Sequence, residues 1–382
     1  MSISATASPA PLPDPSPLSR KSGALAHDLA PVAAWLFVCA AMVFLMVVVG
    51  GITRLTLSGL SMTEWKPVTG IVPPLSAADW TAEFAKYKAI PEYRAVRLDM
   101  TLNEFKGIYY WEYAHRLLGR LVAVAFAVPL AWFAVRRRLP RSLLMPLCGI
   151  LLLGLAQGVL GWYMVKSGLV DRVEVSQYRL VAHLAIALGL YAALLWLALN
   201  LAFPVARHRR RDRDRAAEVS PIWRRAAEII VLLVALTIAG GGFTAGLRAG
   251  LTYNTFPLMD GGLVPAGYAS LQPFWRNWFE NVAAVQFDHR LLAIATATII
   301  VLLWCVGRQS QLSGPARAAL NAVFGAVTLQ VALGVATLLF VVPIPLAAAH
   351  QGVAVALLTA AIVFRHSLRR PRLMNAAGIA AV

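Results

Sequence analysis

Long apolar runs, separated by short polar segments, follow one another along most of the chain. A helix needs about 20 apolar residues to cross a hydrocarbon core roughly 30 Å thick, and eight runs reach or approach that length. They cover residues 32–53, 109–135, 142–165, 178–203, 224–246, 284–306, 318–342 and 344–364. Each run is expected to be a helix, because no other open structure satisfies its backbone hydrogen bonds in lipid. The pattern therefore predicts eight transmembrane helices.

The composition leads to the same protein class. Apolar residues make up 59% of the 382 residues and charged residues 14%, whereas soluble domains have roughly 45–50% and about 25%. These proportions exclude a soluble enzyme, a disordered chain and a coiled coil. We predict an all-α integral membrane protein, with the lipid bilayer as the partner of its apolar surface.

The basic residues give a predicted orientation. The formal net charge is +17, but the arginines gather between apolar runs, which indicates anionic lipid and not nucleic acid. They occupy alternate loops and the end of the chain: Arg136, Arg137, Arg138, Arg141, Arg207, Arg209, Arg210, Arg211, Arg213, Arg215, Arg308, Arg317, Arg365, Arg369, Arg370 and Arg372. Both termini should then be cytoplasmic, with segments 54–108 and 247–283 outside. The Pro-, Ser- and Ala-rich start resembles neither a cleaved signal peptide nor a mitochondrial presequence, so we expect a bacterial inner membrane.

The chain contains an internal repeat of four predicted helices. Gly50-Gly51-Ile52-Thr53 matches Gly241-Gly242-Phe243-Thr244, which lies 191 residues later, and His115-Arg116-Leu117-Leu118 matches His289-Arg290-Leu291-Leu292 at an offset of 174. Gln157 and Gly161 recur as Gln330 and Gly334, and Ala182-His183 recurs as Ala349-His350. Four spans followed by four of the same orientation form a parallel repeat about an axis along the membrane normal. We therefore predict two pseudo-symmetric four-helix bundles.

This organisation divides the chain into five predicted segments. They are a disordered cytoplasmic tail (1–31), an N-terminal four-helix repeat (32–205), a basic cytoplasmic linker (206–222), a C-terminal four-helix repeat (223–366) and a cytoplasmic tail (367–382).

Four of the seven histidines lie inside predicted helices, in two pairs related by the repeat: His115 with His183, and His289 with His350. A helix rise of about 1.5 Å per residue places all four roughly 22–36 Å above the cytoplasmic edge, in the outer part of the bilayer. A single intramembrane histidine often only donates a hydrogen bond to a neighbouring helix, but a repeated pair favours ligation. Two imidazoles on facing helices suit the axial positions of haem iron, although periodicity alone does not exclude another metal.

Further polar residues repeat beside these histidines. Arg116 and Arg290 are candidates for holding haem propionates, with extension to lipid phosphate as the alternative. Gln157 and Gln330 are expected to contact either a cofactor edge or a neighbouring helix. The Gly-, Pro- and aromatic-rich segments after the first and fifth spans are expected to form structured caps over the helix ends.

The two halves differ three residues before the first histidine of each. Glu112 shares a helix face with His115, whereas its counterpart is the neutral Gln286. A carboxylate beside a haem ligand can move protons, so we predict catalysis by Glu112 in the first half and a permanent cofactor in the second. The alternative is that Glu112 orients His115 or pairs with Arg116. Asp288 lies off this face and is expected to pair with a local base.

Together these motifs resemble the haem A synthase family. The resemblance covers about residues 32–366 and is carried by Gly50-Gly51-Ile52-Thr53-Arg54, Ser58-Gly59-Leu60-Ser61, Glu112-x-x-His115-Arg116, Ala182-His183, Gly250-Leu251-Thr252 through Met259-Asp260, His289-Arg290 and Ala349-His350-Gln351. Some bacterial members have a cysteine pair in the first outer loop. This sequence has none there and is more similar to the proteobacterial and mitochondrial type.

The resemblance implies eight helices in two bundles and a definite reaction. The C8 methyl group of haem O would be oxidised through successive hydroxylations to a formyl group, giving haem A for terminal oxidases. His115 and His183 would bracket the substrate haem O, while His289 and His350 would hold a low-spin haem b that passes electrons. Glu112 matches the acidic residue of the family. The implied partners are haem O synthase, cytochrome oxidase assembly factors and a second copy in a homo-oligomer.

Two other functions are compatible with four intramembrane histidines. A diheme cytochrome b would relay electrons without modifying haem, but it gives no reason for an acid in one half alone. A transporter or assembly protein would handle haem without chemistry, and parallel repeats are common among transporters. The intramembrane charges, however, gather toward one membrane face and form no polar path across the midplane.

Overall fold

Eight long helices make up most of the described chain, and each is long and apolar enough to cross a membrane. The structure is a computed structural model that describes residues 29–66, 69–171, 175–203 and 221–369. The helices are α2 (Ala30–Leu55), α5 (Leu102–Val135), α6 (Arg141–Asp171), α7 (Gln177–Ala202), α9 (Pro221–Gly246), α11 (Val282–Gln309), α12 (Gly314–Leu339) and α13 (Ile344–Ser367). The predictions of an all-α membrane protein and of eight spans are confirmed.

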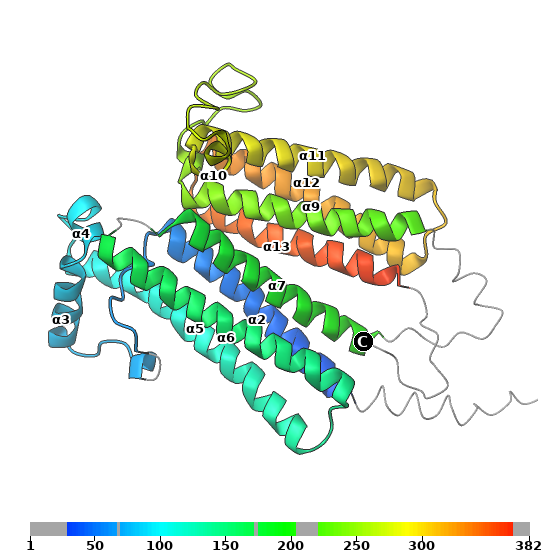
Figure 1. Cartoon of the computed structure of the whole chain (residues 1–382), viewed down its shortest axis with the longest axis horizontal. Coiled ribbons are helices and arrows are strands. Elements are labelled where there is room, and N and C mark those ends of the chain that lie inside the picture. The colour runs from blue at the N-terminus through cyan, green and yellow to red at the C-terminus, as the bar shows by residue number, and fades with distance from the viewer. Residues whose placement is uncertain (1–28, 67–68, 172–174, 204–220, 370–382) are drawn as a thin grey trace, which may run out of the picture.

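The helices form two bundles that lie side by side (Figure 1). In the first, α2 packs on α5 and α7, and α6 also packs on α5 and α7; in the second, α9 and α12 both pack on α11 and α13. Between the bundles, α2 packs on α13, α9 packs on α7, and α7 meets α13. Exchanging the two halves turns the contact of α2 with α13 into that of α9 with α7 and leaves the contact of α7 with α13 unchanged. This arrangement is compatible with the predicted pseudo-twofold axis.

Side-chain contacts tie the two bundles together. Arg54 at the end of α2 donates to the carbonyls of Ala245, its own repeat counterpart, and of Gly246, at 3.1 and 3.2 Å. Farther along the helices, the hydroxyls of Tyr191 in α7 and Thr359 in α13 lie 2.6 Å apart. One continuous set of buried apolar side chains includes members of both bundles, so their interface is a core and not a loose contact.

The two long connections at one end of the bundles are folded, as expected for caps. The first contains η1 (Thr69–Ile71), α3 (Ala77–Lys88) and α4 (Pro91–Val96). The second contains η2 (Ala249–Leu251), η3 (Phe274–Arg276) and α10 (Asn277–Glu280). Figure 1 shows both connections at the same end of the molecule.

The first connection also explains why α5 is longer than predicted. A capping box at Thr101 starts the helix at Leu102, seven residues before the predicted start at 109. The additional turns present the buried Phe105, which packs against the buried Trp80 of α3, as does Tyr109 at the predicted start. Aromatic contacts outside the apolar run therefore extend this helix.

At the same end, α12 stops at Leu339, three residues before the predicted end at 342. Val341 and Val342 have φ values of +59° and +57°, which no right-handed helix accommodates. Pro343 then caps the start of α13. Proline is tolerated at this place because the first residues of a helix need no N–H for an intrahelical hydrogen bond.

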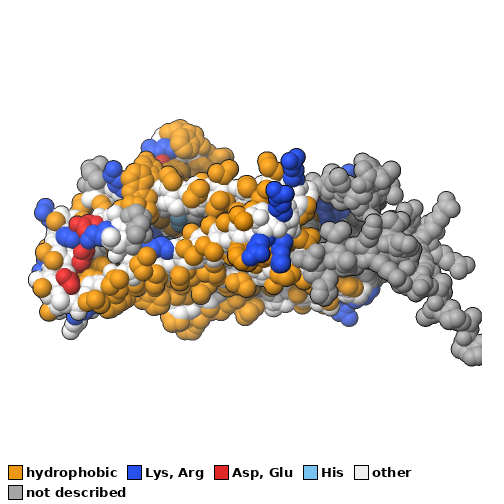
Figure 2. All heavy atoms as spheres, turned by 90° about the horizontal axis from the view of Figure 1, so that it is seen from below, with side chains coloured by type: hydrophobic (Ala, Val, Ile, Leu, Met, Phe, Trp, Pro, Cys, Tyr) orange, Lys and Arg blue, Asp and Glu red, His pale blue; other side chains and the backbone are white. Residues whose placement is uncertain are grey.

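The surface matches a membrane setting. Figure 2 shows hydrophobic side chains over the length of the bundles, with acidic side chains near one end, where Lys and Arg also lie, and a further group of Lys and Arg toward the other end. The predicted tails and basic linker fall largely outside the described residues: 1–28, 204–220 and 370–382. The five predicted segment boundaries stay a prediction.

Candidate functional site

The four intramembrane histidines lie near the same ends of their helices, two in each bundle. His115 and His183 lie on α5 and α7, and His289 and His350 lie on α11 and α13. Since α2 and α6 each contact both α5 and α7, the two helices that carry the first histidine pair are diagonal across their bundle, and α11 and α13 are diagonal in the same way. The structure thus places each predicted pair within one bundle, on two diagonal helices.

Each imidazole rests on a glycine of a neighbouring helix. A Cβ atom added at Gly50 of α2 would lie 2.8 Å from Cε1 of His115, and one added at Gly241 of α9 would lie 3.1 Å from Cε1 of His289. Both distances are shorter than the ordinary van der Waals range that begins at 3.4 Å. We call such a glycine a histidine seat.

The other two histidines have equivalent seats. The corresponding distances are 3.0 Å from Gly161 of α6 to His183 and 2.8 Å from Gly334 of α12 to His350. All four seats obey the sequence repeat, because Gly50 corresponds to Gly241 and Gly161 to Gly334. A side chain at any of these positions would displace the ring, so the glycines fix where the imidazoles lie.

The ring nitrogens fit a bound metal cofactor. Nδ1 of every one of the four histidines is buried, and within the described residues it has no hydrogen-bond partner. Buried polar atoms in proteins are normally paired, and coordination is one way in which an imidazole is satisfied. The described part of the chain brings no three His, Cys, Asp or Glu side chains together. Haem needs only two protein ligands, since its porphyrin supplies the other four nitrogens.

Glu112 and Arg116 fasten the connection after α2 onto α5. Glu112 is a buried residue, 2% exposed, and its carboxylate accepts hydrogen bonds from Ser61 Oγ and from the Met62 backbone N–H, both at 2.7 Å. Arg116 donates to Glu112 and to the carbonyls of Met62 and Glu64, the last two at 2.8 and 3.1 Å. The alternative in which Glu112 pairs with Arg116 is therefore present in the structure.

The second half builds the same clamp with opposite hydrogen-bonding polarity. Gln286 donates to the Ala249 and Tyr253 carbonyls at 2.8 and 3.4 Å and accepts from Arg290 at 3.1 Å. Arg290 also donates to the carbonyls of Tyr253 and Thr255 at 2.5 and 2.8 Å. Tyr253 and Thr255 are the repeat counterparts of Met62 and Glu64, so this loop clamp is a duplicated feature.

The remaining predicted polar residues have protein partners too. Asp288 accepts a hydrogen bond from the hydroxyl of Tyr268 at 2.9 Å, not from a base as expected. Gln157 donates to the backbone carbonyl of His183 at 3.0 Å, and Gln330 approaches Nε2 of His350 at 3.5 Å. Both glutamines thus lie against the histidine helices, which was one of the two expected placements.

The first connection continues along α5 beyond the clamp. Tyr113 donates to the Ile71 carbonyl at 2.5 Å, and Arg120 donates to the Lys66 carbonyl at 2.8 Å. On the outer side of this segment, hydrogen bonds from Lys66 and Lys86 lower the pKa of the Glu64 carboxyl. The segment is therefore fixed both to α5 and to α3.

Sequence reasoning missed several of these roles. Arg120, a cation inside a span whose repeat counterpart is Ile294, was identifiable because intramembrane charges are rare. The seat glycines were visible as repeated residues without an assigned role. The loop carbonyls that face Arg116 and Arg290 leave no signal in the sequence.

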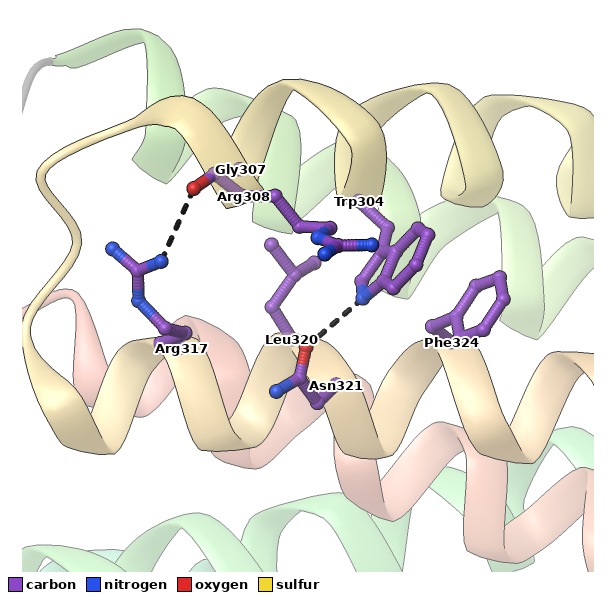
Figure 3. A pocket seen from close by; sticks show the side chains of 7 residues that line it. All are labelled: Trp304, Gly307, Arg308, Arg317, Leu320, Asn321 and Phe324. Carbon is purple, nitrogen blue, oxygen red and sulfur yellow. Dashed lines mark hydrogen bonds between the residues drawn. The ribbon is translucent and has the colours of Figure 1, made fainter.

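A cavity of about 320 Å³ lies elsewhere, between α11 and α12. Figure 3 shows Trp304 and Arg308 of α11 facing Asn321 and Phe324 of α12, with Trp304 Nε1 donating to Asn321. Trp304 is 15 residues from His289 along α11, or roughly 22 Å. This cavity is therefore separate from the histidine pairs.

Comparison with known proteins matches nearly the whole chain to one family. Residues 33–362 match the family described as cytochrome oxidase assembly protein. A haem A synthase of Nitrosospira multiformis is 50% identical over 343 residues, which are 89% of this chain and 94% of that relative. The haem A synthase of Rhodospirillum centenum is 50% identical and covers 89% of both chains. That of Nitrosomonas eutropha is 47% identical, over 87% of this chain and 92% of its own.

Proposed function

The chain belongs to the cytochrome oxidase assembly protein family, and we propose that it makes haem A from haem O by oxidising the C8 methyl group to a formyl group. Its haem A synthase relatives support the product. One observation carries the proposal. Each bundle has a histidine on each of two diagonal helices, and each of these imidazoles lies against a glycine that recurs in the repeat. Since the conversion of methyl to formyl removes electrons from carbon, the enzyme is an oxidoreductase.

The two pairs are assigned different haems. His115 and His183 bind the substrate haem O, and His289 and His350 bind a resident haem b. The assignment rests on the acid: Glu112 lies one turn from His115, and the equivalent residue beside His289 is the amide Gln286. Haem b, when bound, supplies one-electron transfer at the second site.

The residues of the chain position the substrate and handle protons. The Gly50 and Gly161 seats hold the imidazoles of His115 and His183 in place, and the loop clamp closes the first connection over α5. Glu112 acts as the acid or base beside the substrate, because carboxylates in water-poor sites are effective proton carriers.

Arg116 and Arg290 each donate some of their N–H groups to loop carbonyls. We propose that their remaining N–H groups bind haem propionates. Nε of Arg290 is buried and, among the described residues, has no acceptor. A guanidinium has five N–H donors, so one arginine can hold a loop and a carboxylate together.

The membrane setting completes the proposal. The multi-pass chain lies in the bacterial inner membrane with both termini cytoplasmic, which the arginines in alternate loops support. The histidine pairs then lie toward the outer face. Haem O synthase, cytochrome oxidase assembly factors and a second copy of the chain are the proposed protein partners.

Chromatography of extracted haems tests this function. The full chain is expressed with a source of haem O, and formation of haem A or of its hydroxylated precursor supports the synthase. A protein that binds haem b through His289 and His350 but leaves haem O unchanged would be an electron relay or a carrier instead.

A further inference from the structure

One glutamine links the two proposed haem sites across the bundle interface. Gln351 follows His350 on α13, and its Nε2 donates to the Val47 carbonyl of α2 at 2.7 Å. Val47 is buried and lies one turn before the Gly50 seat of His115. A residue beside a ligand of the second site therefore contacts the helix that supports a ligand of the first.

The contact also requires a second glycine. A Cβ atom added at Gly51 would lie 1.7 Å from Oε1 of Gln351, so only a bare backbone allows the side chain to lie there. The adjacent glycines of α2 thus face two ways. Gly50 supports His115 within its own bundle, and Gly51 receives Gln351 from the other.

The mirror contact lacks the hydrogen bond. At Gly242, the counterpart of Gly51, an added Cβ would lie 3.0 Å from Val181 Cγ2 and 3.3 Å from Leu184 Cδ2. Leu184 is the counterpart of Gln351. The repeat preserves the close approach at both glycines, but of these two contacts only the one at Gly51 carries a hydrogen bond among the described residues.

We propose that Gln351 is a positioning residue for the haem O site: it fixes α2 against α13 so that the Gly50 seat meets His115. The inference rests on the proposed function, because it takes His115 as a ligand of the substrate. Gln351 belongs to the second half of the chain but would affect haem O binding in the first half. A merely local role would instead disturb haem b, whose proposed ligand His350 is the adjacent residue.

Gln351→Met tests the proposal, since methionine keeps the length of the side chain and removes the donor. We expect haem b content and its reduced spectrum to stay within about 20% of wild type. The dissociation constant for haem O, from optical titration of the purified protein, should rise on the order of fivefold, the scale of one buried hydrogen bond. Unchanged haem O affinity, or loss of haem b in its place, overturns the proposal.

Two further variants make the result specific. Gly51→Ala keeps the glutamine but occupies its place, so it should weaken haem O binding similarly, and the double variant should be no worse than the stronger single one. Tyr191→Phe is the matched control, because it removes a different polar contact between the bundles, and it should leave haem O affinity within twofold. An equal effect of Tyr191→Phe would mean general loosening of the interface and overturn the inference. Wild-type protein that binds haem O but forms neither haem A nor its hydroxylated precursor would instead refute the proposed function itself.

Discussion

The histidine seats make a prediction in which folding and cofactor binding change in opposite directions. Gly334→Ala would place a methyl group 2.8 Å from Cε1 of His350, about 0.6 Å closer than the 3.4 Å at which ordinary contact begins. The same change in the middle of a helix normally stabilises the fold by about 0.5–1 kcal/mol. The helix therefore gains stability, whereas the imidazole must move by several tenths of an ångström.

A ligand displaced by that amount should bind its cofactor poorly. Binding sites need their groups held within about 0.5 Å of the productive geometry. We therefore expect Gly334→Ala to weaken haem b binding by about tenfold, which corresponds to about 1.4 kcal/mol. The haem-free protein should melt no lower than wild type.

The control lies on the same helix. An added Cβ at Gly325 meets no atom within 4 Å among the described residues, so Gly325→Ala has the gain in helix propensity without the displaced ring. Haem b content is measured from the pyridine haemochrome spectrum of the purified proteins, and stability from thermal unfolding after haem removal. Wild-type haem b affinity in Gly334→Ala, or equal losses in both variants, would refute the role of the seat.

Four other substitutions test the assignments. Glu112→Ala should reduce haem A formation at least 100-fold and keep haem b, as measured by haem chromatography and the reduced spectrum; full activity would remove Glu112 from the chemistry. His350→Ala should abolish the bis-imidazole haem b spectrum, while His115→Ala keeps it, and the reverse result would exchange the two halves. Arg290→Ala should make the connection between α9 and α11 cleavable by protease, because the clamp is lost, and a fall in haem b content as well would support propionate binding.

The spans were predictable because lipid restricts what a crossing segment can be. Twenty apolar residues in a row have few other structures open to them, and the eight runs correspond to the eight helices. The errors in the predicted helix ends occur in segments whose structure is not set by contact with lipid. The first turns of α5 are held by the aromatic side chains of α3, a contact between segments about 25 residues apart that periodicity does not reveal.

The site was predictable to the extent that it is repeated. The offsets of 174 and 167 residues match His115 to His289 and His183 to His350. The structure places the matched histidines on corresponding helices of the two bundles. The surroundings of Arg116 and Arg290 were not predictable, since each arginine faces backbone carbonyls. Carbonyls carry no sequence signal, and their positions depend on the path of a loop. For the same reason Gln351 stood out only as a neighbour of His350.

The loop clamps indicate where the two copies have diverged. In the first half, the loop offers an N–H and a hydroxyl, and the facing residue is the acceptor Glu112. In the second half, the loop offers carbonyls, and the facing residue is the donor Gln286. Exchanging these two side chains would place a donor against donors at position 112 and an acceptor against acceptors at position 286, and each unpaired buried group would cost about 1–3 kcal/mol. The residue and its loop must therefore change together. Under the proposed function, helices that keep the same histidines on the same glycine seats then carry different chemistry, because the loop that contacts position 112 or 286 selects the side chain beside the proposed ligand.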